Sequence, residues 1–205
     1  MSTIKTTNIT HGSNSGTANI VLASDGGITF AKKPALGRQV LEQFFTPCDG
    51  SVITTSNGNI TVGDVDAKQD LTTSYVDAGG SSISYNPPTG TTQVIYEFTF
   101  QTGRVSTTNI SHWKFYIDSD EVTDAYTTFA GDYLGGRFAF KWGINIGGSA
   151  VTATGRQASW SSAKTIKLQT REYGTHTSMI HSTSYTDESG TDTFSSPCIG
   201  ITAIG

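Results

Sequence analysis

The stretch that decides the fold is VIYEFTF, residues 94–100, in which apolar and polar side chains alternate. The even-numbered positions are all apolar, whereas Glu97 and Thr99 fall on the other side of an extended chain. A helix would repeat its apolar residues every three or four positions, so a period of two predicts a β-strand. One face of this strand is expected to be dry and the other wet, as in an antiparallel sheet.

The same alternation recurs in four later segments. Their inward positions are predicted to be Trp113, Phe115 and Ile117; Phe138, Phe140, Trp142, Ile144 and Ile146; Ile166 and Leu168; and Ile199, Ile201 and Ala203. Turn sequences rich in Gly, Pro and Asp separate these segments, and strands do not alternate with helices, which excludes a parallel α/β fold. Residues 35–205 are therefore predicted to form an all-β, antiparallel β-sandwich with jelly-roll connections.

Residues 35–45 are ambiguous. Leu36, Val40 and Phe44 repeat at helical spacing, but Gly37 and the aromatic pair at 44–45 favour a strand. We predict a strand, and this is also the first place where a helix is expected if the chain has one.

Residues 1–34 are predicted to be an extended arm. The segment 22–28 contains Asp-Gly between apolar residues, which is typical of a β-hairpin with a tight turn. An isolated hairpin is marginally stable in water, so the arm needs a surface to lie on. Its candidate anchoring residues are Ile4, Ile9, Ile20, Leu22, Ile28 and Phe30.

Composition excludes several classes of protein. The 205 residues include 23 serines, 33 threonines and 23 glycines, only 15% are charged, and the net charge is −4. Nucleic acid is not an expected partner, because proteins bind it mainly through Lys and Arg at phosphates. No apolar run of about 18 residues could cross a bilayer, and no signal peptide is recognised, so we expect folding in a cytoplasm. Cys48 and Cys198 are expected to be free thiols, with a disulfide formed after release from the cell as the alternative.

Few residues suggest catalysis. Asp118, Asp120, Glu121 and Asp124 form the densest acidic cluster, and paired carboxylates could cleave sugars. The simpler interpretation is a polar hairpin in which Asp side chains bind turn amides, with calcium binding as a further alternative. The four histidines are scattered, and no nucleophile elbow or phosphate loop occurs. We expect no enzyme activity, no metal and no cofactor.

Binding of a surface ligand is a stronger expectation. Trp160 lies in a polar stretch, where its indole either stacks on a sugar ring or plugs the end of the sandwich. Tyrosines close to Gly, Ser and Thr could add an amphipathic contact surface. The candidate binding residues are Trp160, Tyr126, Tyr133, Tyr173 and Tyr185.

Several segments together resemble one family. These are GRQVLEQ (37–43), LTTSYVD (71–77), SISYNP (82–87), VIYEF (94–98), FYID (115–118), KTIKLQTR (164–171) and IGITAI (199–204). They resemble the C-terminal jelly-roll module of tail-fibre and capsid-fibre proteins of marine tailed phages, a module similar to the C1q and tumour-necrosis-factor sandwich. The opening segments IKTTNI (4–9) and IVLASDG (20–26) resemble the starts of phage fibre proteins.

The resemblance implies a homotrimeric virion protein that is assembled in the host cytoplasm. The arm would dock on other capsid or tail proteins, and the sandwich would point outward towards host-surface glycans. Because the sequence has no coiled-coil heptads or β-helical repeats, we expect a short spike, head fibre or fibre tip. The alternatives are a capsid decoration protein that stabilises the shell and, third, a glycan depolymerase.

Overall fold

A computed structural model describes residues 8–9, 20–22, 28–30, 38–104, 109–131, 135–174, 178–183 and 193–205. The chain divides into two compact units, residues 1–39 and 40–205. The sequence prediction placed the boundary between arm and body after Pro34.

The first unit contains a small antiparallel sheet. Its strands are β1 (Asn8–Ile9), β2 (Ile20–Leu22) and β3 (Ile28–Phe30), in the order β1-β2-β3. Leu22 pairs with Ile28, so the strands of the predicted hairpin pair as expected. The predicted Asp-Gly turn and Ile4 lie outside the described residues. The other five candidate anchoring residues lie on these three strands, and their anchoring role stays a prediction.

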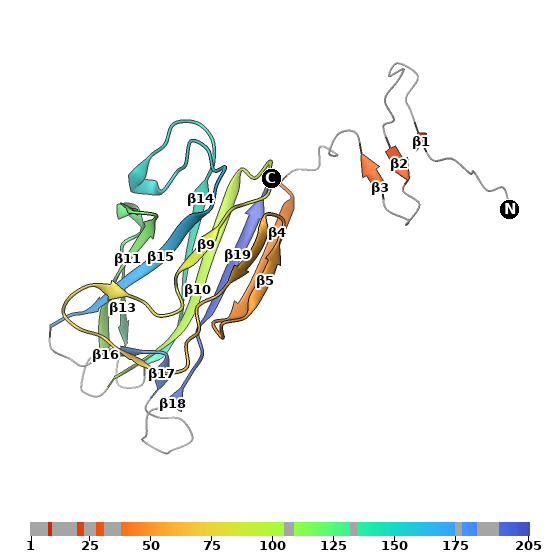
Figure 1. Ribbon diagram of the computed structural model, residues 1–205. Coiled ribbons are helices and arrows are strands. Elements are labelled where there is room, and N and C mark those ends of the chain that lie inside the picture. The colour runs from red at the N-terminus through yellow and green to blue at the C-terminus, as the bar shows by residue number, and fades with distance from the viewer. Residues whose placement is uncertain are drawn as a thin grey trace. The chain divides into compact units, whose positions relative to one another are not determined.

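The second unit is an antiparallel β-sandwich with jelly-roll-like connections (Figure 1). The first sheet contains β4 (Val40–Pro47), β7 (Gln69–Asp70), β10 (Gln93–Arg104), β14 (Gly136–Asn145), β16 (Ser178–Ile180) and β19 (Cys198–Ile204). The second sheet contains β8 (Val76–Asp77), β9 (Ile83–Tyr85), β11 (Asn109–Ile117), β12 (Asp120–Glu121), β13 (Thr127–Gly131) and β15 (Lys164–Glu172). Two hairpins, β5 (Val52–Thr55) with β6 (Gly58–Thr61) and β17 (Ser182–Thr183) with β18 (Thr193–Phe194), accompany the sheets.

The central strand of the first sheet is β10, which contains the deciding stretch 94–100. Its four even-numbered side chains are fully buried, which confirms the predicted dry face. On one side β10 pairs with β14, and on the other it pairs first with β19 and then with β16.

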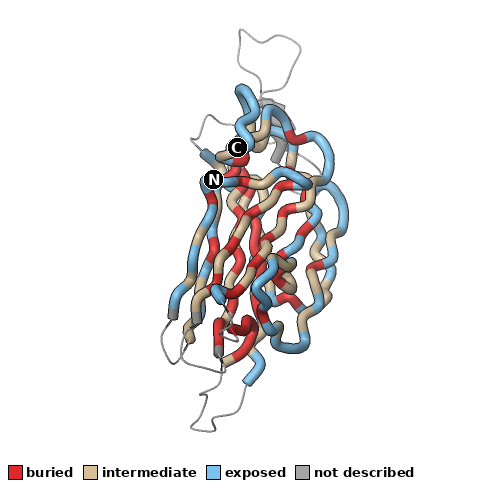
Figure 2. The backbone as a smooth tube through the Cα atoms, turned by 90° about the vertical axis from the view of Figure 1, so that its left-hand side faces the viewer, coloured by how far each residue is buried: buried red, intermediate tan, exposed pale blue. Residues whose placement is uncertain are grey.

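Aromatic rings from both sheets meet in the core. Phe100 of the first sheet stacks on Trp113 of the second at 4.3 Å between centroids, and Phe115 packs against Tyr96 and Phe140. The buried hydrophobic residues form one cluster. Figure 2 shows the buried positions along the backbone of the sandwich strands. Burial of this apolar layer is the main stabilising contribution to the sandwich.

The ambiguous segment forms a strand, as predicted, but the strand begins at Val40 and continues to Pro47. The short 3-10 helices that the structure describes lie elsewhere, at η1 (Thr123–Ala125) and η2 (Thr152–Thr154). The expectation that any helix would lie in residues 35–45 is therefore wrong. Phe44 pairs with Ile201 on the inner face of the sheet, and this cross-strand packing outweighs the helical spacing.

The two ends of the sandwich are distinguished by the strands that begin or finish there. At one end, here called the entry end, β4 begins at Val40, which pairs with Ile204 of β19. The chain therefore passes from the first unit into the sandwich at this end. At the opposite end, here called the far end, β10 finishes beside β16 (Figure 1).

Cys48 and Cys198 are free thiols, of which Cys48 is buried and Cys198 is half-buried. Cys198 pairs with Thr99 on the outer face, where Arg137 donates a hydrogen bond to its Sγ over 3.5 Å. The Cys48 Sγ is buried and donates to the Gly80 carbonyl over 3.3 Å. Burial raises the pKa of Cys48 to about 12, so this thiol stays protonated.

Candidate functional site

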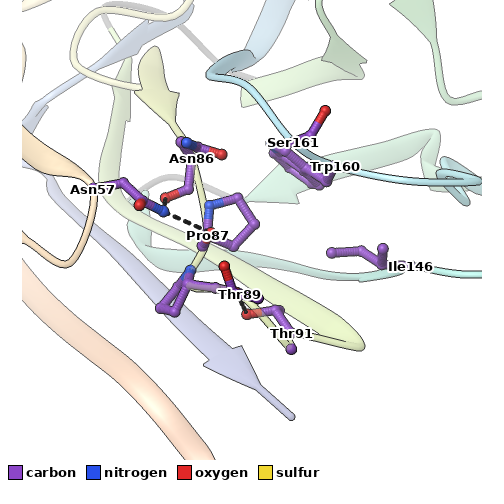
Figure 3. Close-up of a pocket in the computed structure, with 10 residues that line it drawn as sticks. Asn57, Asn86, Pro87, Thr89, Thr91, Ile146, Trp160 and Ser161 are labelled. Atoms are coloured by element: carbon purple, nitrogen blue, oxygen red, sulfur yellow. Dashed lines mark hydrogen bonds between the residues drawn. The ribbon is translucent and has the colours of Figure 1, made fainter.

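A pocket of about 310 Å³ opens at the entry end of the sandwich (Figure 3). Its walls come from the turn between β5 and β6, the loop from β9 to β10, the end of β14 and the segment before β15. The residues that line it are Asn57, Asn86, Pro87, Pro88, Thr89, Gly90, Thr91, Ile146, Trp160 and Ser161. The volume lies at the lower limit of small-molecule sites.

Trp160 forms an apolar wall of this pocket. It is 8% exposed, and its indole Nε1–H donates to the Tyr85 carbonyl over 3.2 Å, which fixes the ring. The side-chain amide of Asn57 donates to the Pro87 carbonyl over 2.8 Å and so holds the loop in place. No described residue that lines the pocket is charged, so the pocket suits an uncharged polar molecule.

A second candidate site covers the outer face of the second sheet, where polar and aromatic side chains gather. We call it the tyrosine face; it consists of Tyr75, His112, Lys114, Tyr116, Glu121, Tyr126, Arg171 and Tyr173. Cross-strand pairing assembles it, because His112 of β11 pairs with Arg171 of β15 and with Thr128 of β13.

Glu121 organises one part of the tyrosine face. Its carboxylate accepts hydrogen bonds from Lys114 over 3.0 Å, from Tyr116 over 2.7 Å and from Tyr126. Burial acts to raise the pKa of Glu121, but the bonds from Tyr116 and Lys114 outweigh it, and the pKa lies below its ordinary value. The hydrogen bond from Lys114 likewise raises the pKa of that ammonium. This part of the face holds an ionised carboxylate that is already satisfied.

Arg171 and Tyr75 form the other part. The Tyr75 ring centroid lies 5.3 Å from the Arg171 guanidinium carbon and 4.7 Å from Lys114 Nζ, within the range of cation–π attraction. Arg171 Nη1 donates to the Thr73 carbonyl over a long 3.4 Å. Its Nε is buried and finds no acceptor in the described parts of the chain. Tyr173 is 54% exposed, and its ring stands edge-on to His112 at 5.7 Å.

The predicted binding residues fall into three groups. Trp160 closes the entry-end pocket, whereas Tyr126 and Tyr173, both 54% exposed, lie on the tyrosine face. Tyr133 and Tyr185 lie outside the described residues. Sequence reasoning did not find Arg171, although its outward position in the alternation of residues 164–171 was a signal that could have found it.

Within the acidic cluster, Asp118 makes contacts that hold the hairpin in place. This residue has a positive φ of 54° in the hairpin, binds Lys164 Nζ over 2.9 Å and accepts the Thr165 amide over 2.8 Å. Burial opposes ionisation, but Lys164 and Thr165 hold the pKa of Asp118 below its ordinary value. Asp120 and Asp124 are exposed. Within the described ranges, no three His, Cys, Asp or Glu side chains converge on a possible metal position.

Comparisons with known proteins give a distant structural similarity. No protein-family model matches the sequence, and no curated protein matches it. A chain from the structure of the Gx strain of infectious bursal disease virus aligns over 89% of this chain and 45% of its own length, with 10% identity and a TM-score of 0.33. A chain from the Gt strain structure aligns over 75% of this chain and 50% of its own, with 10% identity and a TM-score of 0.25.

The present chain thus spans about half the length of these solved chains. In the parts of the protein that the structure describes, no helix is both long and apolar enough to span a membrane.

Proposed function

We propose that the protein is a non-enzymatic structural protein of a phage virion, a homotrimeric spike or fibre that adsorbs to host-surface glycans through its tyrosine face. The observation that carries this proposal is the exposed Tyr173, whose ring stands edge-on to His112, the cross-strand partner of Arg171, an arginine that lacks a carboxylate partner among the described residues. Tyr supplies rigid contact area that tolerates water, as a glycan-binding surface needs. The family resemblance of the sequence segments supports the phage origin, the C1q-like trimer and the docking of the arm on capsid or tail proteins.

The positions of the two candidate sites along the sandwich support the choice of the tyrosine face over the Trp160 pocket. The first unit joins the sandwich at Val40, at the same end as the Trp160 pocket. Arg171 and Tyr173 lie towards the far end, where β15 finishes and the Glu172 amide donates to the Thr72 carbonyl. If the arm docks on the virion, the part of the tyrosine face that contains Arg171 and Tyr173 is better placed than the Trp160 pocket to meet a host surface.

A panel of bacterial surface polysaccharides tests adsorption. We expect the full chain to bind at least one of them and Tyr173→Ala to weaken that binding about twofold to tenfold, the value of one aromatic contact. Phe194→Ala, which removes another exposed aromatic ring from β18, is the matched control and should leave binding unchanged. Failure of every polysaccharide to bind, or equal losses in the two variants, would contradict adsorption through this face.

Virion incorporation is tested separately. Particles should contain the full chain, detected by mass spectrometry, and should lose it when residues 1–34 are deleted, while the truncated protein still binds the polysaccharide. Incorporation of the truncated protein at the normal level would contradict the anchoring role of the arm.

One observation favours a capsid decoration protein as the second candidate. Phe45 on the outer face of the first sheet is 54% exposed and lies over Gly200, where an added Cβ would come within 2.5 Å of the ring. An exposed ring on a flat sheet face is suited to a protein–protein contact. Particles that lack a decoration protein should break at a lower temperature with unchanged adsorption, whereas the adsorption role predicts the reverse.

The absence of enzyme activity is tested through the acidic cluster. Incubation of the protein with polysaccharides should release no new reducing ends, and the triple variant Asp118→Asn, Asp120→Asn, Asp124→Asn should behave in the same way. Reducing ends released by the wild-type protein and not by the triple variant would establish a depolymerase instead.

A further inference from the structure

We propose that the glycan bound at the tyrosine face is acidic, and that Arg171 binds a singly charged oxyanion on the saccharide, either a carboxylate or a phosphodiester. This inference rests on the proposed adsorption function and names the class of its ligand. It is carried by the charge balance of the face and by the unused hydrogen-bond donors of Arg171.

Among the charged residues of the tyrosine face, Arg171 is left without an oppositely charged partner in the described structure. Lys114 forms an ion pair with Glu121 over 3.0 Å. Lys167, which precedes Arg171 on β15, forms an ion pair with Asp77 over 3.0 Å. Both of these ammonium groups are therefore neutralised locally. Arg171 has no carboxylate partner among the described residues, although the chain as a whole carries a net charge of −4. An anionic ligand complements this excess, whereas a cationic ligand would be repelled.

The hydrogen bonds of Arg171 leave one side of the guanidinium unused. Nη1 is directed to the Thr73 carbonyl, while the buried Nε finds no acceptor in the described structure. A buried donor without an acceptor is unfavourable, and an oxyanion at the edge formed by Nε and Nη2 would satisfy it. The planar fork of guanidinium donors fits the two oxygens of a carboxylate or phosphate.

Tyr75 packs against the guanidinium of Arg171. Its ring lies over the guanidinium, and residues 72–74, immediately before it, are exposed. In the described structure, Tyr75 is held by its cation–π contacts with Arg171 and Lys114. Tyr173 stands beside the opposing His112 and offers a ring on which the sugar can stack. The site therefore combines one anion-binding edge with one stacking surface.

The test compares acidic and neutral saccharides by isothermal titration calorimetry on the full chain. The probes are oligogalacturonate, which carries carboxylates, a glycerol-phosphate oligomer, which carries phosphodiesters, and an uncharged galactose oligomer. We expect at least one acidic probe to bind at least tenfold more tightly than the neutral one, and the binding to weaken as salt is added. The stronger of the two acidic probes identifies the oxyanion.

Variants assign the preference to Arg171. Arg171→Gln should weaken binding of the acidic probe about tenfold to a hundredfold, the effect of losing a charged hydrogen bond. Arg171→Lys keeps the charge without the fork and should give a smaller loss. Lys141→Gln, which removes an exposed cation from β14 on the other sheet, is the matched control and should have no effect. Urea unfolding of each variant shows whether it is folded.

The possible outcomes separate the inference from the proposed function. Equal binding of acidic and neutral probes by the wild-type protein overturns the acidic preference, even if Arg171→Gln fails to fold. Neutral-sugar binding that depends on Tyr173 but not on Arg171 also overturns it, while leaving adsorption intact. Binding of none of the probes, together with no binding on the polysaccharide panel, overturns both.

Discussion

His181 should make the sandwich lose stability in mild acid. Its side chain is fully buried, its φ is +64°, and neither ring nitrogen has a hydrogen-bond partner among the described residues. Burial lowers its pKa from 6.5 to about 4, with the neighbouring Gly79 backbone acting weakly in the opposite direction. As the pH falls through 6.5, the unfolded chain binds a proton that the folded chain does not bind until about pH 4. The free energy of unfolding should therefore fall by about 2 kcal/mol between pH 7 and pH 5.

Urea unfolding at pH 7, 6 and 5 measures this loss, and His181→Asn is the diagnostic variant. Asn tolerates a positive φ and does not titrate, so the variant should show little change over the same range. The carboxyl groups of Asp77 and Asp118 have lowered pKa values and titrate below this window. The reasoning is refuted if wild-type stability is constant from pH 7 to pH 5, or if the variant loses as much as the wild type.

Two further substitutions test the packing, and a third tests the subunit contact. Phe100→Ala, which removes the ring stacked on Trp113, should lower the free energy of unfolding by about 3–5 kcal/mol in urea titrations, and a loss below 1 kcal/mol would contradict a tight core. Gly80→Ala should cost at least about 1 kcal/mol and lower the melting temperature, because φ is +77° and the new Cβ would lie 3.0 Å from Cys48 Sγ; an unchanged melting temperature would argue against this backbone conformation. Phe45→Lys should reduce the mass measured by light scattering from trimer to monomer if the outer face of β4 forms the subunit contact, and an intact trimer would place that contact elsewhere.

The long strands could be predicted from sequence because each carries its own pattern. The even positions of residues 94–100 and the odd positions of 113–117 are buried on opposite sheets, as the alternation predicts. Short strands such as β8 and β12 have two residues each, too few to show a period. The pairing of β8 also depends on a partner far along the chain, because Asp77 pairs with Gln169.

The candidate sites were less predictable for the same reason. Tyr126 and Tyr173 were selected from their local composition, but only the register of β11 with β15 places Arg171 opposite His112. Trp160 lies in a polar stretch, yet it is buried because the indole N–H reaches the Tyr85 carbonyl on another strand. Neither contact leaves a local pattern, since each joins segments separated by more than fifty residues.

The difference in burial between Cys48 and Cys198 provides a way to measure how often the sandwich opens. A maleimide dye should react with the folded protein at Cys198 alone, because Cys48 is covered and stays protonated. Slow reaction of a second dye molecule, at Cys48, would then report how often the core between the two sheets opens to solvent. The same single attachment point would allow the protein to be tethered in one orientation, with the opposite sheet left accessible for ligand measurements.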